Sequence, residues 1–247
     1  DGRRPRYIAC NGDESEPGTF KDRQILERNP HKLIEGLLIA GWANTIDAAY
    51  IYLRGEYSGP YENLCRAIDE AYEAGYLGKK ILGSDMDFDI YVHRGAGAYI
   101  CGEETGLMES LEGRKGQPRK RPPFPAVSGL WKQPTLINNV ETMAHVPTIV
   151  REGAKHFLSY GTEKSAGTTI FGISGDVMRP GAYELPFGMP LDEMINEVAG
   201  GVAPGRTIKA VIPGGTSMPV LTADQIKGLP MDHDSLQKAG SLLGTGA

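Results

Sequence analysis

The chain has 247 residues, 40% of them apolar and 23% charged, which predicts one large domain or two ordinary ones with a sizeable core. Its formal net charge of −5 argues against nucleic acid as the main partner. The cysteines Cys10, Cys65 and Cys101 stand far apart, which excludes a disulfide framework and a four-cysteine zinc or iron–sulfur site, and favours a reducing, intracellular compartment.

Strands and helices are expected to alternate along the first half of the chain. Asn29 and Pro30 indicate the start of a helix, since Asn caps helices and Pro suits the first helical position. Its apolar face is expected to hold Leu33, Ile34, Leu37, Leu38 and Trp42. Further helices are expected at 61–74 and 103–111, and strands at 6–10, 48–53 and 88–93. This alternation predicts a layered, Rossmann-like α/β domain with ligands at the carboxyl ends of its strands.

Residues 113–135 carry no periodic pattern and are rich in basic residues and proline. They predict a long extended loop that presents Phe124, and such loops are usually functional or disordered. A further helix is expected to open at Asn138, because Asn138 and Glu141 have the spacing of a capping box.

The pattern changes near residues 161–167. Strands are then expected at 168–174, 182–185 and 208–212, with a short helix at 191–198 between the second and the third. This β-β-α-β order predicts a small β-grasp module. We therefore expect an α/β domain over residues 1–163 and a β-grasp domain over residues 164–247.

The Gly-rich stretch from Gly95 to Gly106 joins a predicted strand to a predicted helix, where backbone N–H groups can approach a ligand. It fails as a dinucleotide fingerprint because Ile100 replaces the third glycine. It fails as a triphosphate loop because Glu103 and Glu104 stand where Lys and a hydroxyl residue belong. Such a loop predicts a ligand site, but not that of a nucleoside triphosphatase.

Two acidic turns follow predicted strands: Asp13-Glu14-Ser15-Glu16 and Glu103-Glu104. Each suits a solvated loop or a helix start, where carboxylates favour the positive end of the dipole. Because loops after parallel strands meet at one edge of a sheet, they could instead accept hydrogen bonds from ribose or ribityl hydroxyls or from ring N–H groups. A hard-cation site is the rival use. For Cys101, packing is favoured over nucleophilic chemistry, since the neighbouring carboxylates disfavour the thiolate.

The neutral side chains of Asn138, Asn139 and Thr142 lie at a predicted helix start, which suits either simple capping or the binding of a phosphate monoester. The basic stretch 114–121 suits a solvated face, a pyrophosphate site or a surface that faces a partner subunit.

Four long motifs together resemble the flavin-binding subunit of respiratory complex I and the diaphorase subunits of NAD-linked hydrogenases and formate dehydrogenases. They are C-N-G-D-E-S-E-P-G-T-F-K-D-R from Cys10, H-R-G-A-G-A-Y-I-C-G-E-E-T from His93, R-P-P-F-P-A from Arg121 and I-N-N-V-E-T from Ile137. The segment I-S-G-x-V-x-x-P-G-x-Y-E from Ile173 is similar to the soluble ligand-binding β-grasp module of that family.

The resemblance implies an NADH dehydrogenase flavin subunit, in which FMN takes hydride from NADH and passes single electrons to iron–sulfur clusters and on to quinone. It implies no catalytic side chain in the strict sense. By motif position, the FMN contacts would be Asn11, Asp13, Glu14, Gly102, Glu103, Asn138, Asn139 and Thr142. The NADH side would be lined by Glu16, Tyr99, Glu104 and Phe124, with Gly95 and Gly97 in the Gly-rich loop.

An upstream Gly-rich loop and a C-terminal helical domain with a 4Fe-4S cluster belong to the family but not to these residues. We therefore expect both ends to be cuts within a longer protein, and the cluster to lie in that parent protein only. The expected partners are neighbouring iron–sulfur subunits, in a cytoplasmic position peripheral to the inner membrane and without direct insertion. The alternatives are a hydrogenase or formate dehydrogenase diaphorase subunit and a non-catalytic docking module.

Overall fold

The computed structural model describes residue 2 and residues 4–247, which divide into two compact units. The first unit runs up to Ser15 and resumes from Asp22 to Thr148. The second consists of Glu16–Lys21 and Ile149–Ala247. The division near residue 163 falls inside the second unit and stays a prediction.

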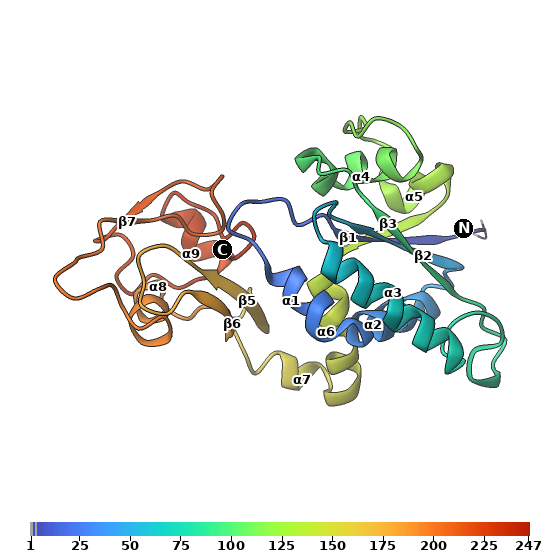
Figure 1. Cartoon of the computed structure of the whole chain (residues 1–247), viewed down its shortest axis with the longest axis horizontal. Coiled ribbons are helices and arrows are strands. Elements are labelled where there is room, and N and C mark those ends of the chain that lie inside the picture. Colours follow the sequence, from blue (N-terminus) through green and yellow to red (C-terminus); the bar gives the residue numbers. More distant parts are fainter. Residues whose placement is uncertain (1, 3) are drawn as a thin grey trace. The chain divides into compact units, whose positions relative to one another are not determined.

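The first unit is built on a parallel sheet of four strands: β1 (Tyr7–Gly12), β2 (Ala48–Leu53), β3 (Asp89–Arg94) and β4 (Thr135–Asn139). Their order is β3-β2-β1-β4, with Ala9 paired to Tyr50 on one side and to Ile137 on the other (Figure 1). The three strands predicted for this unit are confirmed within one or two residues, whereas β4 was not predicted. Because β2 and β4 flank β1 on opposite sides, the strand order reverses between β1 and β4.

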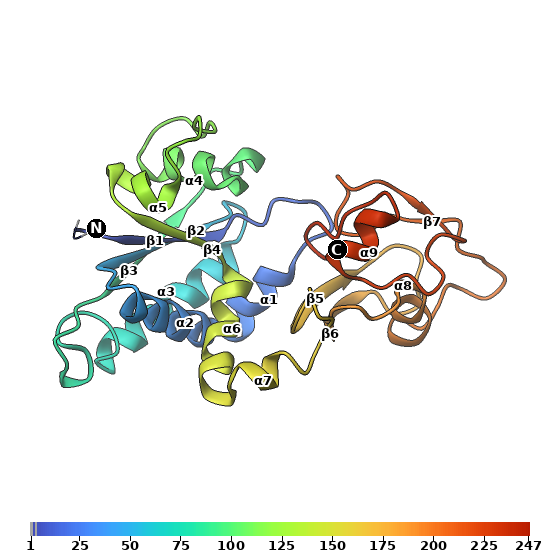
Figure 2. The ribbon, with the colours of Figure 1, turned by 180° about the vertical axis from the view of Figure 1, so that it is seen from behind.

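Helices cover both faces of this sheet. One face carries α1 (Lys21–Arg28), α2 (Pro30–Ala43), α3 (Ser58–Glu73) and α6 (Val140–Glu152), and the other carries α4 (Glu104–Leu111) and α5 (Pro125–Ser128) (Figures 1 and 2). This arrangement is the layered, Rossmann-like α/β fold that the sequence predicts.

Glycines and aliphatic residues fix how α2 packs. It begins at Pro30 as predicted, although the Asn29 side chain makes no capping hydrogen bond. Placing Trp42 on its apolar face is wrong, because that side chain is 71% exposed. The buried line of the helix instead passes through Gly41, where an added Cβ would lie 2.5 Å from the Phe88 ring. Gly36 allows a similar close approach to α6, since its Cβ would lie 1.9 Å from the Met143 carbonyl oxygen.

Alternate residues of the central strands enter the two core layers. Tyr52 packs on the α4 side with Ala9, Leu107 and Met108. By the period of two in a strand, Ile51 faces the opposite layer, and it is fully buried there. Both faces of the sheet are therefore covered by packed side chains, and the carboxyl ends of its parallel strands lie at one edge.

The stretch 113–135 is only partly the loop predicted for it. Residues 113–124 contain no helix or strand, but α5 follows at Pro125, a 3-10 turn spans Leu130–Lys132 and β4 begins at Thr135. These elements are three to five residues long, too short to show a period in the sequence.

The second unit contains α7 (Ala154–Phe157) and the antiparallel pair β5 (Thr168–Ile173) and β6 (Gly181–Pro186). There follow α8 (Leu191–Glu193) with a π-turn to Val198, the short pair β7 (Ala210–Val211) and β8 (Leu221–Thr222), and α9 (His233–Lys238). The predicted β-β-α-β order is confirmed, with the third strand shorter than expected. Its core includes Phe171, Leu191, Met194, Leu221 and Leu236. Among the described residues, no helix has the length and apolar character needed to cross a bilayer.

Candidate ligand site at the carboxyl edge of the sheet

The reversal of strand order between β1 and β4 marks the crevice where open α/β sheets bind ligands. Asn11 connects the segments that meet there. Its side-chain amide donates to the Gly102 carbonyl oxygen at 2.8 Å, and its own carbonyl oxygen accepts from the Asn139 side chain at 3.1 Å. The end of β1, the Gly-rich loop and the end of β4 are thus held together, and they carry Asn11, Gly102 and Asn139, which the resemblance assigned to one site.

Asp13 carries a buried acceptor at this edge. The residue is 6% exposed, and its Oδ2 accepts from the Ser15 hydroxyl at 2.9 Å. Its Oδ1 is buried without a hydrogen-bond partner among the described residues. Burial raises the pKa of this carboxyl; the Ser15 hydrogen bond and the charge of Arg54 act in the opposite direction. The site therefore contains a carboxylate oxygen that an N–H or O–H group of a ligand could satisfy.

The Glu14 carboxylate has a structural role at the start of α1 that the sequence did not predict. Its carboxylate accepts from the backbone N–H groups of Asp22 at 2.8 Å and Arg23 at 3.0 Å, in the first turn of α1. It also accepts from the Tyr57 hydroxyl at 2.8 Å, and burial, followed by the Glu14 charge, raises the pKa of that phenol. The carboxylate thus satisfies open donors at the positive end of a helix. A ligand contact by Glu14 stays a prediction.

The acidic pair of the Gly-rich loop is joined to the basic loop by one residue, Arg121. Glu103 is the N-cap of α4, where its Oε2 accepts from the N–H groups of Thr105 and Gly106 at 2.9 Å. Arg121 forms an ion pair with Glu103 Oε1 and another with Glu104 Oε1, the latter at 2.8 Å. Burial opposes ionisation of Glu103, but these hydrogen bonds and the guanidinium charge outweigh it and lower the pKa.

The other arginines of the basic loop turn back onto α4. Arg114 Nη2 lies 2.9 Å from Glu109 Oε1, and Arg119 Nη2 lies 2.7 Å from Glu112 Oε1. Hydrogen bonding by Arg114 contributes most to lowering the pKa of Glu109 to about 2. The chain's own carboxylates thus take up much of the positive charge, while the pyrophosphate and partner-surface interpretations stay predictions.

Glycines let the loop lie close to its surroundings. An added Cβ at Gly95 would lie 2.8 Å from the Tyr52 hydroxyl, and one at Gly97, where φ is +79°, would lie 3.0 Å from Glu56 Oε1. One at Gly102 would lie 3.4 Å from the Asp13 carbonyl oxygen. The same region presents two large aromatic rings to solvent.

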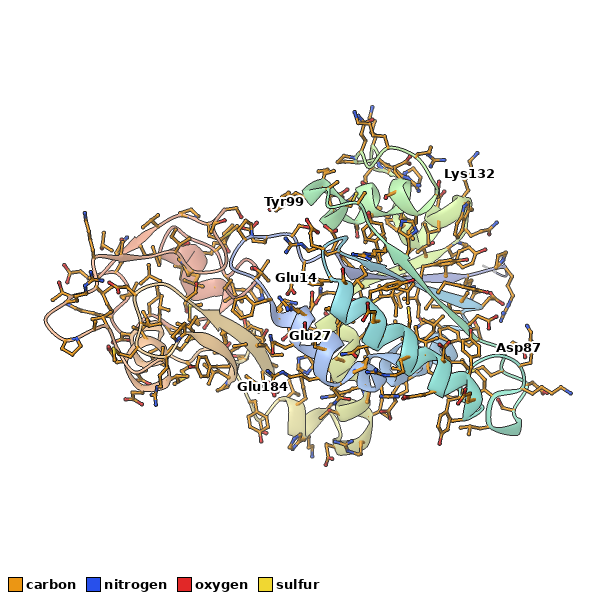
Figure 3. The ribbon with its side chains drawn as sticks, in the orientation of Figure 1. Glu14, Glu27, Asp87, Tyr99, Lys132 and Glu184 are labelled. Carbon is orange, nitrogen blue, oxygen red and sulfur yellow. The ribbon has the colours of Figure 1, made fainter. Side chains whose placement is uncertain are left out.

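Those rings belong to Tyr99, which is 58% exposed, and Phe124, which is 57% exposed. Tyr99 starts the 3-10 turn before α4 and projects outward from it (Figure 3), and Phe124 immediately precedes α5. Both were expected on the NADH side, and more than half of each side chain is exposed.

The start of α6 differs from the capping box predicted for it. Asn138 is a strand residue paired with Cys10, so it cannot cap the helix, and that part of the prediction is wrong. Asn139 caps instead, its Oδ1 accepting from the Glu141 N–H at 3.0 Å. Its amide also donates to Asp22 Oδ2 at 2.7 Å, which braces β4 against α1. Thr142 lies exposed in the first turn.

Glu16 is not grouped with these residues. It belongs to the second unit, is 8% exposed, and accepts from the Ser217 N–H at 2.7 Å through Oε1. Cys101 is buried and close-packed, since a Cβ added at Gly116 would lie 2.6 Å from its Sγ. No group of three or more potential metal-binding side chains occurs in the described part of the chain, so the cation-site alternative gains no support.

Arg121 and Tyr57 contact carboxylates of the candidate site, and sequence reasoning did not select either of them. Arg121 stands inside one of the recognised motifs, and the clustering of basic residues opposite two glutamates was a usable signal for it. Tyr57 had no such signal, because its contact with Glu14 spans 43 residues and depends on the packing of β1 beside β2.

Comparison with known proteins agrees with this geometry. Residues 1–148 match a family described as the Nuo51 FMN-binding domain, and residues 169–242 match an SLBB domain. An NADH-quinone oxidoreductase subunit of Escherichia coli is 51% identical over 97% of this chain and 54% of its own length. The corresponding protein of Rhizobium meliloti, also named as an NADH-quinone oxidoreductase subunit, is 54% identical over 98% of this chain and 57% of its own length.

A solved structure of an NAD+-reducing [NiFe]-hydrogenase in the air-oxidised state superimposes with a TM-score of 0.85 at 38% identity. The match covers 99% of this chain and 40% of the hydrogenase chain. The chain thus spans little more than half the length of the curated relatives that it matches. With more than half of its residues in one family match, the chain belongs to the Nuo51 FMN-binding family.

Proposed function

We propose that this chain is the FMN- and NADH-binding part of an NADH dehydrogenase flavin subunit, with FMN in the crevice between β1 and β4. Family membership and relatives named as NADH-quinone oxidoreductase subunits support the activity. The main observation in support of this site is the Oδ1 atom of Asp13, which is buried without a hydrogen-bond partner among the described residues, at the point where the strand order reverses.

The residues at this edge fit the chemical groups of FMN. Asp13 offers an acceptor for a ribityl hydroxyl or a ring N–H, and Gly102 keeps the facing loop free of a side chain. The first turn of α6 offers backbone N–H groups and the positive end of a helix dipole, which suit a phosphate monoester. Asn138 and Thr142 lie beside that turn. Acceptors for hydroxyls and donors for a phosphate thus follow the two neighbouring strands between which the strand order reverses, which supports the proposal.

When bound, FMN accepts hydride from NADH and releases electrons singly to iron–sulfur centres. The chain's own residues bind and orient the two nucleotides. Tyr99 and Phe124 offer exposed ring faces for stacking on an aromatic ring. Arg121 moderates the charge of Glu103 and Glu104, so that a dinucleotide pyrophosphate meets less repulsion.

The partners would be neighbouring iron–sulfur subunits, in an assembly peripheral to the inner membrane, with a 4Fe-4S cluster outside these residues. A diaphorase role is the second candidate, which the likeness to a hydrogenase structure favours. The higher identity to NADH-quinone oxidoreductase subunits favours the first.

Flavin absorbance tests the proposal. The protein that contains this chain is purified after incubation with FMN, and its visible spectrum is followed while NADH is added under anaerobic conditions. Bound flavin that NADH bleaches is the expected result. Protein that retains no flavin, or retains flavin that NADH leaves unchanged, would refute the enzymatic proposal and favour a docking module. Bleaching by NADH followed by electron delivery to a hydrogenase partner would favour the diaphorase role.

A further inference from the structure

Arg119 contacts the chain on both sides of the segment 120–128, which carries the exposed ring of Phe124. Its backbone N–H donates to the Thr105 hydroxyl at 2.8 Å, in the first turn of α4. Its guanidinium donates through Nη1 to the carbonyl oxygen of Gly129 at 3.0 Å, directly after α5. Arg119 therefore holds the start of this segment with its backbone and the end with its side chain.

Two glutamates at the end of α4 hold the same guanidinium. Arg119 Nε donates to Glu109 Oε1, and Arg119 Nη2 lies 2.7 Å from Glu112 Oε1. Glu112 Oε1 also accepts from the Trp131 N–H at 2.7 Å. Because a guanidinium carries five donors in a rigid fork, it can bind three acceptors in one fixed arrangement. The position of Gly129 is thus tied to the end of α4.

The Thr105 hydroxyl connects Arg119 to the candidate site. Thr105 is buried, and its hydroxyl accepts from the Arg119 N–H and donates to Glu103 Oε2 at 2.5 Å. Arg121 pairs with the other oxygen of the same carboxylate. Residues 119–121 are therefore bound to the start of α4, beside the acidic pair.

The backbone between Arg119 and Phe124 is exposed but stiff. Residues 120–124 are all exposed and contain no helix or strand, and Pro125 is the next buried residue. Pro122 and Pro123 fix φ at two successive positions, which stiffens the backbone there. A displacement of Arg119 is therefore passed on to the Phe124 ring rather than absorbed between them.

We propose that Arg119 is a positioning residue for NADH binding, because it holds both ends of the segment that presents Phe124. This inference rests on the proposed function, in which Phe124 lies on the NADH side. Arg119 bonds to Thr105, Glu109 and Gly129 of its own chain. It acts on a nucleotide only through the place that it gives to the Phe124 ring.

The substitution Arg119→Lys tests this role in the protein that contains this chain. Lysine keeps the positive charge beside Glu109 and Glu112 but has no fork with which to reach Gly129 at the same time. Arg114→Lys is the matched control. The Arg114 side chain pairs with the same two glutamates, is 56% exposed and bonds to no other residue in the described part of the chain.

We expect Arg119→Lys to raise the KM for NADH by about tenfold while kcat changes by less than about twofold, which is the pattern of a lost binding contact. Both constants are measured with ferricyanide as the electron acceptor, and Arg114→Lys should leave them unchanged. A KM in Arg119→Lys equal to that in Arg114→Lys, or a fall in kcat alone, would overturn the inference.

Cleavage by trypsin reports whether the segment is held, and it does not need the flavin. Both variants keep every tryptic site, so cleavage after Lys120 can be compared directly. It should be at least about tenfold faster in Arg119→Lys than in Arg114→Lys, because proteases cut exposed segments that open. Equal cleavage rates would contradict the proposal. If Arg119→Lys does not fold, Glu112→Gln replaces it, since glutamine keeps an acceptor for the Trp131 N–H and removes the charge that faces Arg119.

The two proposals fail in different ways. Wild-type protein whose flavin NADH does not bleach would overturn the proposed function, and the trypsin comparison would still decide whether Arg119 holds the segment. Bleaching by NADH in the wild type, together with equal KM values in the two variants, would leave the function standing and remove the positioning role.

Discussion

Replacing Asp13 by Asn should make the ligand-free protein more stable and weaken its binding of FMN. Asp13 is 6% exposed, and one of its carboxylate oxygens has no partner among the described residues. An unsatisfied buried polar group costs about 1–3 kcal/mol, and more when charged. Asn keeps the shape and can still accept from the Ser15 hydroxyl, but carries no charge. We therefore expect a gain of about 1 kcal/mol, or a Tm higher by about 2–4 °C for a chain of this size.

The stability difference between Asp13→Asn and wild type should depend on pH, and the direction of that dependence follows from the pKa of Asp13. Burial raises the pKa of Asp13 in the folded protein above its unfolded value, so its effect on stability is most favourable when the carboxyl is protonated and is lost as the pH rises through the folded pKa. Asn does not titrate. The stability gap between Asp13→Asn and wild type should be largest near neutral pH and should shrink as the pH falls and the wild-type carboxyl takes up its proton.

Thermal denaturation with and without added FMN measures both effects. A ligand that binds only the folded state stabilises it, and the stabilisation grows with the ratio of ligand concentration to Kd. Added FMN should therefore raise the Tm of the wild type, and it should raise the Tm of Asp13→Asn by less. Asp85→Asn, at an exposed aspartate, is the control and should behave as wild type. An Asp13→Asn protein that is no more stable than wild type without ligand, or that keeps the full FMN shift, would refute the reasoning.

Four further substitutions test individual contacts. Glu103→Ala removes the N-cap of α4 and should lower the free energy of unfolding by about 0.5–2 kcal/mol, measured in urea. Tyr57→Phe removes the hydroxyl that donates to Glu14 and should cost about 1–2 kcal/mol in the same assay. Leu107→Ala, at a fully buried core position, should cost about 2–5 kcal/mol. Glu104→Ala should narrow the preference for NADH over NADPH if its charge repels the extra phosphate, and an unchanged ratio of the two kcat/KM values would exclude that role.

The periodic elements of the fold could be predicted from the sequence, whereas short or unusually capped elements such as α1 and β4 were missed because they lack local signals. The strand at Ala48–Leu53 and the helix after Pro30 carry their pattern within one window of sequence. The helix α1 has no such start signal, because the carboxylate at its first turn comes from Glu14, seven residues upstream of Lys21. Strand β4 is five residues long and ends in two asparagines, which indicated a helix cap instead.

The meeting of the strand ends at one edge could be predicted, but the partners of the carboxylates there could not. Strand ends in a parallel sheet meet at one edge, so Asn11 and Gly102 were correctly expected close together. Whether a carboxylate faces a ligand or a neighbouring segment depends on contacts between residues far apart in sequence. Glu16 and Ser217 are 201 positions apart, so no local sequence pattern could predict their hydrogen bond.

The Gly-rich loop illustrates why those partners matter for function. Read alone, Glu103 and Glu104 place two negative charges where phosphate loops carry a lysine and a hydroxyl residue, which predicts repulsion of a triphosphate. In the folded chain Arg121 pairs with both, so one formal negative charge remains where the sequence showed two. The cation that a phosphate loop carries within its motif is supplied here from another loop. Under the proposed function, the site would keep carboxylates for hydroxyls and still admit a dinucleotide, and its specificity against an extra phosphate would depend on how tightly Arg121 holds Glu104.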